Sequence, residues 1–301
     1  MADNMMLDIC CVGHITLDKV VTRKTTVYMP GGTSFYFSNA ICNMDVQYAL
    51  VTAMAVSETD AVTALRAKGI DVKLWPSAHT VFFENSYSDN QDHRTQKVLQ
   101  QADPFTVEQL LNVDAAIFHL GPLLAGDIPT ELIKVLAGRA KVSLDVQGFL
   151  RKVGNYAVCA IDWAAKKEAL PYIHFIKANE YEMEVLTGHS DVYKGAKTLY
   201  EWGAKEVIIT LGSKGSLIYC DDIFYTIPAY YPVSVEDATG CGDTYMAGYL
   251  YQRVKGCTIQ QAGEFAAAMA TLKIESSGPF TGTKEDVYAL LESNNRMTVN
   301  F

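Results

Sequence analysis

The sequence has no long hydrophobic run and no cluster of basic residues. None of its apolar stretches approaches the roughly eighteen residues that a membrane span needs, and the N-terminal run at 9–12 is too short for a signal peptide. No basic run is longer than two residues, and the net charge is −9. A nucleic-acid-binding protein needs clustered Lys and Arg to neutralise phosphates. We therefore predict a cytoplasmic protein that has neither a membrane nor a nucleic acid as its partner.

Cysteines at metal-ligand spacing are also absent, as is a dinucleotide-binding motif. The seven cysteines form no C-x-x-C pair and none stands near histidines at ligand spacing, so we interpret them as reduced, mostly buried thiols. No G-x-G-x-x-G follows the first apolar run, which argues against a dinucleotide-dependent oxidoreductase. The chain has no low-complexity segment, linker or internal repeat. We predict a single domain over residues 1–301.

Short apolar runs rich in β-branched residues alternate with helical patterns along much of the chain. Each run ends at a polar residue or a glycine, which is typical of central parallel strands that are buried on both faces. The runs lie at 7–13, 115–121, 141–146, 173–179 and 206–212. The helical patterns lie at 106–112, 128–138, 180–188 and 193–203. This alternation predicts an α/β fold in which helices cover both faces of a central, mostly parallel sheet.

Two segments, 17–29 and 79–100, break this alternation. Both alternate polar and apolar residues and contain many Thr, Val, Tyr and Phe, a pattern that favours strands with one solvent-exposed face. We expect them to form a small separate β-sheet that projects from the main body as a lid. The alternative is a pair of edge hairpins without a gating role.

A glycine-rich turn precedes an amphipathic helix in "VEDATGCGDTYMAGYLY", residues 235–251. The N–H groups of Gly240, Cys241 and Gly242 can hold an anion at the helix start, yet Asp243 would repel that anion. The conflict is resolved if the anion is a phosphoryl group in transfer, because this reaction needs stabilised charge and a base for the attacking hydroxyl. The stretch therefore predicts Asp243 as a catalytic base beside an anion hole, with a plain turn and helix cap as the structural alternative.

The motif "DATGCGD" resembles the D-[TA]-x-G-[AC]-G-D signature of the PfkB (ribokinase-like) carbohydrate kinase family. The resemblance covers essentially the whole chain, because further motifs follow in the family's order and spacing. It implies a ribokinase-like fold, ATP as the phosphoryl donor, Mg²⁺, and a monovalent cation such as K⁺. It also implies a homodimer that forms through the lid.

Two N-terminal motifs resemble the acceptor side of the family. "VGHITLD" resembles the first strand and places the sugar-binding acid at Asp18, whose carboxylate can accept hydrogen bonds from neighbouring hydroxyls. "PGGTSFYFSNA" resembles the glycine pair that faces the substrate, at Gly31 and Gly32. Most sugar kinases of the family carry an asparagine four residues after the second glycine, where this chain has Tyr36. Asn39 lies on nearly the same helical face and is the candidate substitute.

Further acceptor contacts are predicted on the lid and at a strand end. Arg94 matches a lid arginine near the substrate or phosphoryl group, and its alternative is a solvated surface charge. Asp145 and Gln147 end a predicted parallel strand, where ligands bind in open α/β sheets, and their alternative is a hydrogen-bonded loop anchor. His14 and His119 also lie at strand ends, and we assign both of them structural roles.

The donor side is predicted from three segments. "KANEYEME" resembles the N-x-x-E motif of the water and Mg²⁺ network around the phosphates, with Glu182 acting on the metal through water. "TLGSKG" resembles the T-x-G-x-x-G nucleotide loop. The helix and turn at 262–278 border the adenine in the family, although their alanine content fits tight helix packing equally well. The resemblance thus assigns the nucleotide side to Asn179, Glu182, Thr210, Gly212, Gly215, Ala266, Ala270 and Ser277.

Within the family, the segments "GGTSFYFSN", "DVQGFLR" and "RTQKVLQQADP" look most like the branch that contains myo-inositol kinases. The prediction is an ATP-dependent kinase that phosphorylates a hydroxyl of a small sugar, a polyol such as inositol, or a related acceptor. A nucleoside kinase and a 2-keto-3-deoxy sugar acid kinase are alternatives within the family. A catalytically silent regulatory or scaffold protein is the alternative of another class. Such proteins usually lose the base or the anion hole, and both are present here.

Overall fold

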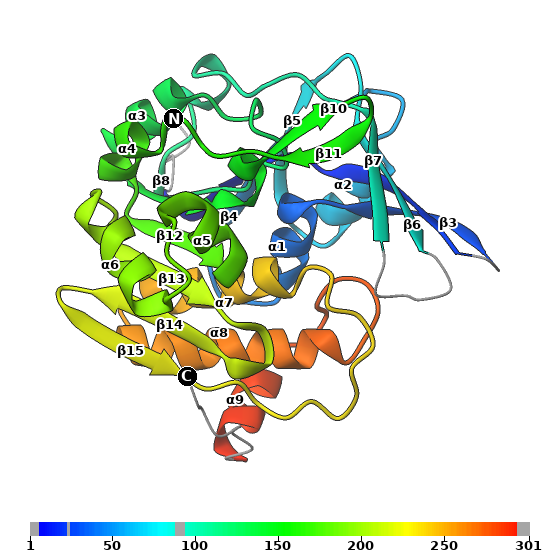
Figure 1. The fold of residues 1–301 in the computed structure, drawn as a ribbon. Helices are drawn as coiled ribbons and strands as arrows, with labels where there is room; N and C mark the ends of the chain where they lie inside the picture. The colour runs from blue at the N-terminus through cyan, green and yellow to red at the C-terminus, as the bar shows by residue number, and fades with distance from the viewer. Residues whose placement is uncertain (1–5, 23–24, 88–93, 294–301) are drawn as a thin grey trace.

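A large, mostly parallel sheet runs through the centre of the protein (Figure 1). The computed structural model describes residues 6–22, 25–87 and 94–293, and within these ranges the sheet has nine strands in the order β15-β14-β13-β12-β9-β8-β1-β4-β5. All neighbours from β13 to β5 are parallel, whereas β14 and β15 are antiparallel. The strands are β1 (Leu7–Val12), β4 (Tyr48–Met54), β5 (Asp71–Pro76), β8 (Ala115–Leu120), β9 (Lys141–Asp145), β12 (Phe175–Asn179), β13 (Glu206–Thr210), β14 (Ser216–Cys220) and β15 (Ile223–Ile227). The five predicted apolar runs form β1, β8, β9, β12 and β13, which confirms the predicted central sheet.

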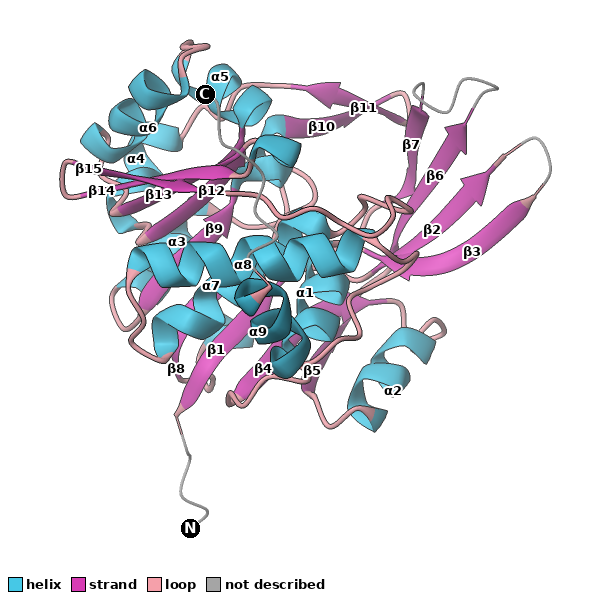
Figure 2. Ribbon diagram, turned by 90° about the horizontal axis from the view of Figure 1, so that it is seen from below, coloured by secondary structure: helices cyan, strands magenta, loops and turns pink. Residues whose placement is uncertain are grey.

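Helices cover both faces of this sheet, as predicted (Figure 2). Successive side chains of a strand point to opposite faces. In β1, Ile9 and Cys11 therefore pack with α1, α2, α7, α8 and α9, whereas Cys10 and Val12 pack with α3, α4, α5 and α6. The helices are α1 (Thr33–Ile41), α2 (Asp60–Ala67), α3 (Thr130–Ala137), α4 (Lys166–Ala169), α5 (Glu180–Thr187), α6 (Val192–Glu201), α7 (Cys241–Val254), α8 (Ile259–Ile274) and α9 (Lys284–Glu292).

The helix predicted at 106–112 is wrong, since that segment contains only a 3₁₀ turn at Glu108–Leu110. Leu110 is buried but Leu111 is 57% exposed, so no continuous apolar stripe faces the core. A stretch this short also forms few i→i+4 hydrogen bonds to offset the cost of helix nucleation.

A second sheet projects from the main body (Figure 1). Its described strands follow the order β10-β11-β7-β6-β2-β3, and both of the polar-apolar segments of the sequence contribute to it. β2 pairs with β6 in parallel, and the other pairs are antiparallel. The strands are β2 (Thr16–Val21), β3 (Thr26–Gly31), β6 (Val81–Tyr87), β7 (Arg94–Gln100), β10 (Arg151–Gly154) and β11 (Ala157–Ala160). The predicted small separate sheet is therefore confirmed, and the β10–β11 hairpin is an addition that the sequence pattern did not indicate.

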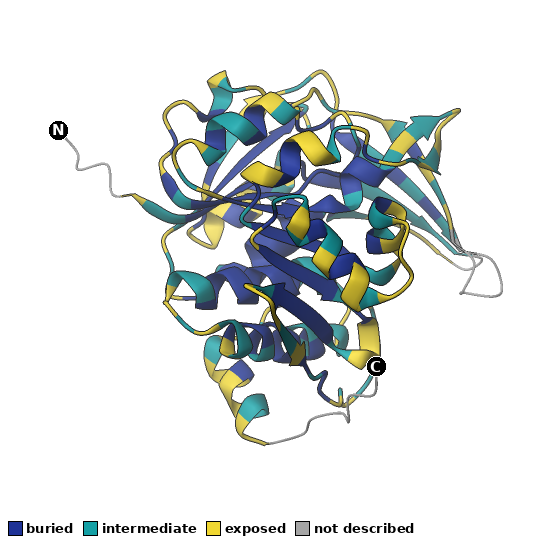
Figure 3. Cartoon of the chain, turned by 60° about the vertical axis from the view of Figure 1, so that its left-hand side comes forward, coloured by how far each residue is buried: buried dark blue, intermediate teal, exposed yellow. Residues whose placement is uncertain are grey.

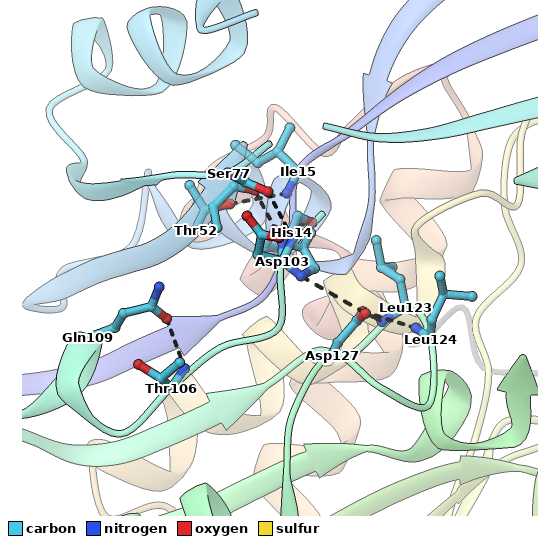
Figure 4. Close-up of polar contacts among 12 residues, drawn as sticks. His14, Ile15, Thr52, Ser77, Asp103, Thr106, Gln109, Leu123, Leu124 and Asp127 are labelled. Carbon is cyan, nitrogen blue, oxygen red and sulfur yellow. Dashed lines mark hydrogen bonds and ion pairs between the residues drawn. The ribbon is translucent and has the colours of Figure 1, made fainter. Parts of the chain in front are cut away.

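The junction between the two sheets is held by polar contacts around the end of β1 (Figure 4). The backbone N–H of Ile15 donates to Oγ1 of Thr52 at 3.2 Å. The ring of His14 stacks on Phe105 with 4.5 Å between centroids, and its Nδ1 lies 3.2 Å from the carbonyl oxygen of Ala53. These contacts agree with a structural role for His14, because they fix the chain where it passes from the central sheet into the second sheet.

A buried ion pair anchors α7 to β13. Glu206 is 3% exposed and accepts hydrogen bonds from Arg253, at 2.6 Å, and from the hydroxyl of Tyr249, also at 2.6 Å. Burial alone would raise the pKa of Glu206, but His174, Arg253 and Tyr249 together lower it to about 2. Glu206 is therefore ionised at neutral pH and holds the helix whose first turn carries the glycine-rich motif.

The buried residues follow the strands and the inward faces of the helices (Figure 3). Phe118, Phe175, Phe265 and Tyr249 are among the largest fully buried side chains. Among the residues that the structure describes, no helix has the length and apolar character that a membrane span requires.

Candidate active site

The starts of α1 and α7 meet near the carboxyl ends of the central strands. α1 begins directly after Gly31 and Gly32, and its first residue, Thr33, forms a hydrogen bond with the carboxylate of Asp243 in the first turn of α7. A Cβ at Gly121, just beyond β8, would lie 2.5 Å from Cγ2 of Thr33. The structure thus brings together two motifs that are about two hundred residues apart in the sequence, and both present helix N-termini to the same place.

Only glycine fits at position 240, because of the backbone conformation there and because of a neighbouring aromatic ring. The φ of Gly240, +78°, lies in the left-handed region, and a Cβ would lie 2.1 Å from the ring of Tyr36. Tyr36 is 3% exposed. It occupies the position at which most sugar kinases of the family that the sequence resembles carry asparagine. Its ring forms one wall of the glycine turn, so the departure from the family pattern is accommodated by packing.

The helix-start N–H groups of α7 are not all available to an anion. The N–H of Cys241 donates to the carbonyl oxygen of Ala238 at 3.2 Å, which closes the turn. The N–H groups of Gly242 and Asp243 lie in the first turn, where an α-helix offers no acceptor of its own. Burial raises the pKa of Cys241 to about 11, so its side chain is a neutral thiol at neutral pH. Of the predicted anion-hole N–H groups, that of Cys241 is therefore engaged within the turn, whereas those of Gly242 and the adjacent Asp243 have no intrahelical acceptor and could hold an anion.

The carboxyl group of Asp243 has an unusual acidity. Burial is the largest cause and Asp145 the second, and together they raise its pKa to about 7, although Lys177, Thr33 and Arg151 oppose the shift. A carboxylate with a pKa near neutrality can take up a proton during a reaction and release it afterwards. This property distinguishes Asp243 from an ordinary capping aspartate, whose pKa would be lowered by the helix N-terminus.

Lys177 is a central residue of the site that the sequence pattern did not reveal. Its Nζ lies 2.8 Å from Oδ2 of Asp145, and a Cβ at Gly242 would lie 2.9 Å from the same Nζ. Burial would lower the pKa of Lys177, but Asp145, Glu182 and Asp243 raise it above its ordinary value. The side chain is therefore a buried ammonium group directly beside Gly242 at the start of α7.

Asp145 ends β9, as predicted, and both of its carboxylate oxygens are in use. Oδ2 accepts from Lys177, and Oδ1 accepts from the backbone N–H of Gln147 at 3.0 Å. Burial raises its pKa, but the ammonium of Lys177 outweighs burial, so that the pKa of Asp145 is lowered. This geometry makes Asp145 the group that orients Lys177. Gln147 is partly exposed in the turn that follows.

Asn179 and Glu182 form a capping box at the start of α5. Oδ1 of Asn179 accepts from the N–H of Glu182, and Oε2 of Glu182 accepts from the N–H of Asn179, each at 2.8 Å. The motif therefore has a local structural purpose. Burial is the largest cause that raises the pKa of Glu182, while Lys177 lowers it and Asp145 raises it. Its carboxyl group thus belongs to the same charged cluster as Lys177 and Asp145.

The predicted nucleotide loop lies at the end of the neighbouring strand. Thr210 ends β13, and Gly212 and Gly215 adopt φ values of +59° and +94° in the turn to β14. Ala266 and Ala270 lie on α8. The carbonyl oxygen of Ala270 accepts a long hydrogen bond from Sγ of Cys241 at 3.8 Å. Ser277 is exposed in the turn that follows α8. The contact between Cys241 and Ala270 joins α8 to the first turn of α7.

Asp18 and Gly31 lie close together on the neighbouring strands β2 and β3 of the second sheet, although in the strand register Gly31 pairs with Thr16 and Asp18 pairs with Met29. Oδ1 of Asp18 accepts from Oγ1 of Thr16 at 2.7 Å. A Cβ at Gly31 would lie 2.5 Å from Oδ2 of Asp18, so only glycine leaves room for the carboxylate. Gly32 has a φ of +89° and immediately precedes α1. Asp18, Gly31 and Gly32 therefore share the base of the second sheet, beside the start of α1.

The candidates Asn39 and Arg94, and His119 with its predicted structural role, have different surroundings. Asn39 is 1% exposed; its Nδ2 donates to the carbonyl oxygen of Phe35 at 2.8 Å, and its Oδ1 accepts from Lys68 at 2.5 Å. Both ends of its amide are therefore engaged within the core. Arg94 begins β7, and its side chain lies outside the described part of the structure. His119 has a pKa that burial lowers to about 4, so it is neutral in the core.

The site combines a base near neutral pKa, helix-start N–H groups and a buried ammonium group, a set that suits transfer of a phosphoryl group to a hydroxyl. The family model of the pfkB family carbohydrate kinases matches residues 6–286 of this chain. The chain belongs to this kinase family. The family match spans both sheets and the whole of the site described above.

Known members of the kinase family resemble this chain over most of its length. The cytidine kinase of Thermococcus kodakarensis is 27% identical over 274 residues, which are 85% of this chain and 92% of that protein. The nucleoside kinase of Methanocaldococcus jannaschii is 25% identical over 91% of this chain and 92% of its own length. The solved structure of a pyrophosphate-dependent kinase in the ribokinase family, complexed with a pyrophosphate analog and myo-inositol, has a TM-score of 0.83. It is 30% identical and covers 93% of this chain and 99% of its own.

Proposed function

We propose that this protein is a Mg²⁺- and ATP-dependent kinase that transfers the γ-phosphoryl group to a hydroxyl of a small sugar or polyol, with myo-inositol as the foremost acceptor. The observation that carries the proposal is the position of Asp243 in the first turn of α7, where it contacts Thr33 at the start of α1 and adjoins Gly242 and the ammonium of Lys177, and where burial raises its pKa to about 7. It supports the assignment of Asp243 as the general base, because a base is most effective when its pKa lies near the working pH.

The residues of the site divide the work of the reaction. Asp243 accepts the proton of the acceptor hydroxyl as the hydroxyl oxygen attacks the phosphorus and the bond to the leaving phosphate breaks. The N–H groups of Gly242 and Asp243 and the ammonium of Lys177 stabilise the charge on the transferred group. Asp145 keeps Lys177 in place through their 2.8 Å contact.

Mg²⁺ would neutralise charge on the phosphates of the donor. Mg²⁺ in proteins usually keeps several waters and needs only one or two carboxylates besides the phosphates. Among the described residues no group of three or more His, Cys, Asp and Glu could hold a metal ion without such help. Glu182, which is partly exposed and belongs to the charged cluster, fits this indirect mode of binding through water.

The acceptor proposal rests on the second sheet. Asp18 is partly buried beside the start of α1, and its carboxylate can accept hydrogen bonds from adjacent hydroxyls. The 30% identical neighbour with bound myo-inositol favours a polyol. Nucleosides are the next candidates, because the similar curated proteins are cytidine and nucleoside kinases, and 2-keto-3-deoxy sugar acids follow.

The outer strand β3 exposes Val27 and Tyr28, which fits a homodimer formed through the lid.

Pyrophosphate is a second candidate donor, and one structural observation favours it. The loop before α7 is bonded to the end of α8: the N–H of Val233 donates to Glu275 at 2.7 Å, and the N–H of Glu236 donates to the carbonyl oxygen of Ile274 at 2.9 Å. If the adenine of ATP lies beside the end of α8, as the family resemblance implies, it needs space between these two bonded segments, whereas pyrophosphate needs only the phosphate side of the site. The neighbour of known structure is itself pyrophosphate-dependent.

One assay separates these possibilities and tests the kinase proposal. The purified protein is incubated with ATP or pyrophosphate and with myo-inositol, ketoses, 2-keto-3-deoxy acids or nucleosides, and the phosphorylated acceptor is detected by mass spectrometry. We expect a phosphorylated polyol with at least one donor. If no acceptor of any class is phosphorylated while the protein is folded, the regulatory or scaffold alternative replaces the kinase.

Asp18→Asn tests the acceptor side. The substitution keeps the size of the side chain but removes the charge that strengthens hydrogen bonds from hydroxyls. Because a charge-assisted hydrogen bond contributes about 1.5–3 kcal/mol, we expect the acceptor KM to rise about tenfold or more. The KM of the phosphoryl donor should change little. An unaltered acceptor KM would restrict Asp18 to its structural contact with Thr16.

Glu182→Gln tests the metal side. Gln retains an oxygen that can accept the capping hydrogen bond from the N–H of Asn179, so α5 should keep its start. The loss of the charge should raise the Mg²⁺ concentration needed for half-maximal rate. Superimposable Mg²⁺ titrations of the variant and the parent would limit Glu182 to the capping box.

A further inference from the structure

Lys273, near the end of α8, is a fully buried ammonium group in an oxygen cage. The side chain is 0% exposed. Its Nζ lies 2.7 Å from the carbonyl oxygen of Asp237, 3.4 Å from the carbonyl oxygen of Ser276 and 3.5 Å from the carboxylate Oδ2 of Asp237. Burying a charge is costly unless such partners surround it, so the cage and the ammonium depend on each other.

The oxygen cage around Lys273 includes a residue that precedes the proposed anion hole by a few positions in the sequence. Asp237 is the first residue of the "DATGCGD" motif, and its Oδ1 accepts from the N–H of Thr239 at 2.9 Å. The N–H of Asp237 donates to the carbonyl oxygen of Ile274 at 3.2 Å. Burial raises the pKa of Asp237, but the contacts with Thr239 and Lys273 outweigh it and lower that pKa. The ammonium of Lys273 therefore joins the end of α8 to the turn that carries the anion hole and Asp243.

Two carbonyl oxygens and a carboxylate are the ligands that a hard cation takes from a protein. The family resemblance implied a monovalent cation such as K⁺. Here the oxygens of Asp237 and Ser276 that border the motif already surround the Nζ of Lys273. The residues therefore do not fit a monovalent cation at this place, because its charge is supplied by the chain itself.

We propose that Lys273 is a built-in cation that positions the anion-hole turn, so that the protein requires no monovalent cation. The consequence for the reaction rate rests on the proposed kinase function, whereas the consequence for the fold does not. Lys273 does not touch the reacting atoms and acts through the turn at Asp237–Asp243.

The first test uses the unmodified protein and measures its melting temperature, its donor affinity and its rate in buffers of equal ionic strength that contain KCl or tetramethylammonium chloride. We expect all of these quantities to be the same in both salts. The proposal would be overturned by a melting temperature that is several degrees higher in K⁺ than in tetramethylammonium. A donor affinity or a rate that is several times higher in K⁺ would overturn it as well. Thermal melting and donor binding reveal whether the protein depends on K⁺ even if no acceptor is found. Failure of the kinase proposal can therefore be distinguished from failure of the proposal about Lys273.

The second test compares Lys273→Ala with Lys273→Met. The alanine variant leaves a cavity lined by the cage oxygens, and the methionine variant fills that cavity with an uncharged side chain. Because a small displacement of a catalytic turn can reduce a rate by about 10²-fold, both variants should be strongly impaired in tetramethylammonium. We expect K⁺ or NH₄⁺ to restore the melting temperature and the rate of Lys273→Ala and not of Lys273→Met. Full activity of Lys273→Ala without K⁺, absence of rescue in the folded alanine variant, or equal rescue of both variants would each overturn the proposal.

Discussion

Asp243→Asn is expected to lower kcat by about 10²–10⁴-fold, the usual cost of removing a general base. The amide keeps the size of the carboxylate and can still accept a hydrogen bond from Thr33, but it cannot accept the proton of the acceptor hydroxyl. Binding of the phosphoryl donor should persist or become slightly tighter, because a carboxylate that repels the donor phosphates is gone. The measurement is kcat and donor Kd on the same purified variant, with the acceptor established by the assay above.

The pKa of Asp243 adds a second expectation. The base works only in its ionised form, so kcat/KM of the unmodified enzyme should decrease as the pH falls below about 7. The folded protein raises this pKa above that of the unfolded chain, and ionised Asp243 therefore destabilises the fold increasingly as the pH rises towards 7. Asp243→Asn should thus be at least as heat-stable as the parent at pH 8. A plain turn aspartate would behave in the opposite way, with lost stability and an unchanged kcat per folded molecule.

The sequence pattern predicted the central sheet well because five buried strands appear as continuous apolar runs with sharp ends. It also predicted the second sheet from polar-apolar alternation. The β10–β11 hairpin was missed because its strands have four residues each, too few to show a period of two. The helix expected at 106–112 was wrong because a few apolar residues without tertiary support do not overcome helix nucleation.

The candidate site was predictable where a motif is local and not predictable where the contact is tertiary. The turn at Gly240–Asp243 could be interpreted from its own residues, and the pair Asn179 and Glu182 was found through the resemblance of "KANEYEME" to the family's N-x-x-E motif. Lys177 was missed because one lysine in an apolar strand gives no pattern, and only the fold places it beside Asp145 and Gly242. A buried lysine in the middle of the run "IHFIKAN" was the available signal, since an unpaired charge is rarely buried.

Lys177→Met is expected to reduce kcat by about 10²–10³-fold, the effect of removing one donor from an anion hole. The substitution keeps the length of the side chain and removes the charge next to Gly242. It also leaves the carboxylate of Asp145 buried without its partner, which costs about 3–5 kcal/mol of stability. A lower rate alone could therefore reflect a damaged fold.

The double variant Asp145→Asn/Lys177→Met separates the two effects. Removing both partners of a buried ion pair eliminates the unpaired charge, so most of the free energy of unfolding lost in Lys177→Met should return. If Lys177 stabilises the transferred phosphoryl group, kcat of the double variant stays low despite the recovered stability. If kcat returns together with stability, Lys177 serves only to neutralise Asp145, and the anion hole consists of backbone N–H groups alone. Urea unfolding and single-turnover rates of the parent, the two single variants and the double variant complete the cycle, and only a persistent loss of rate identifies Lys177 as a catalytic residue.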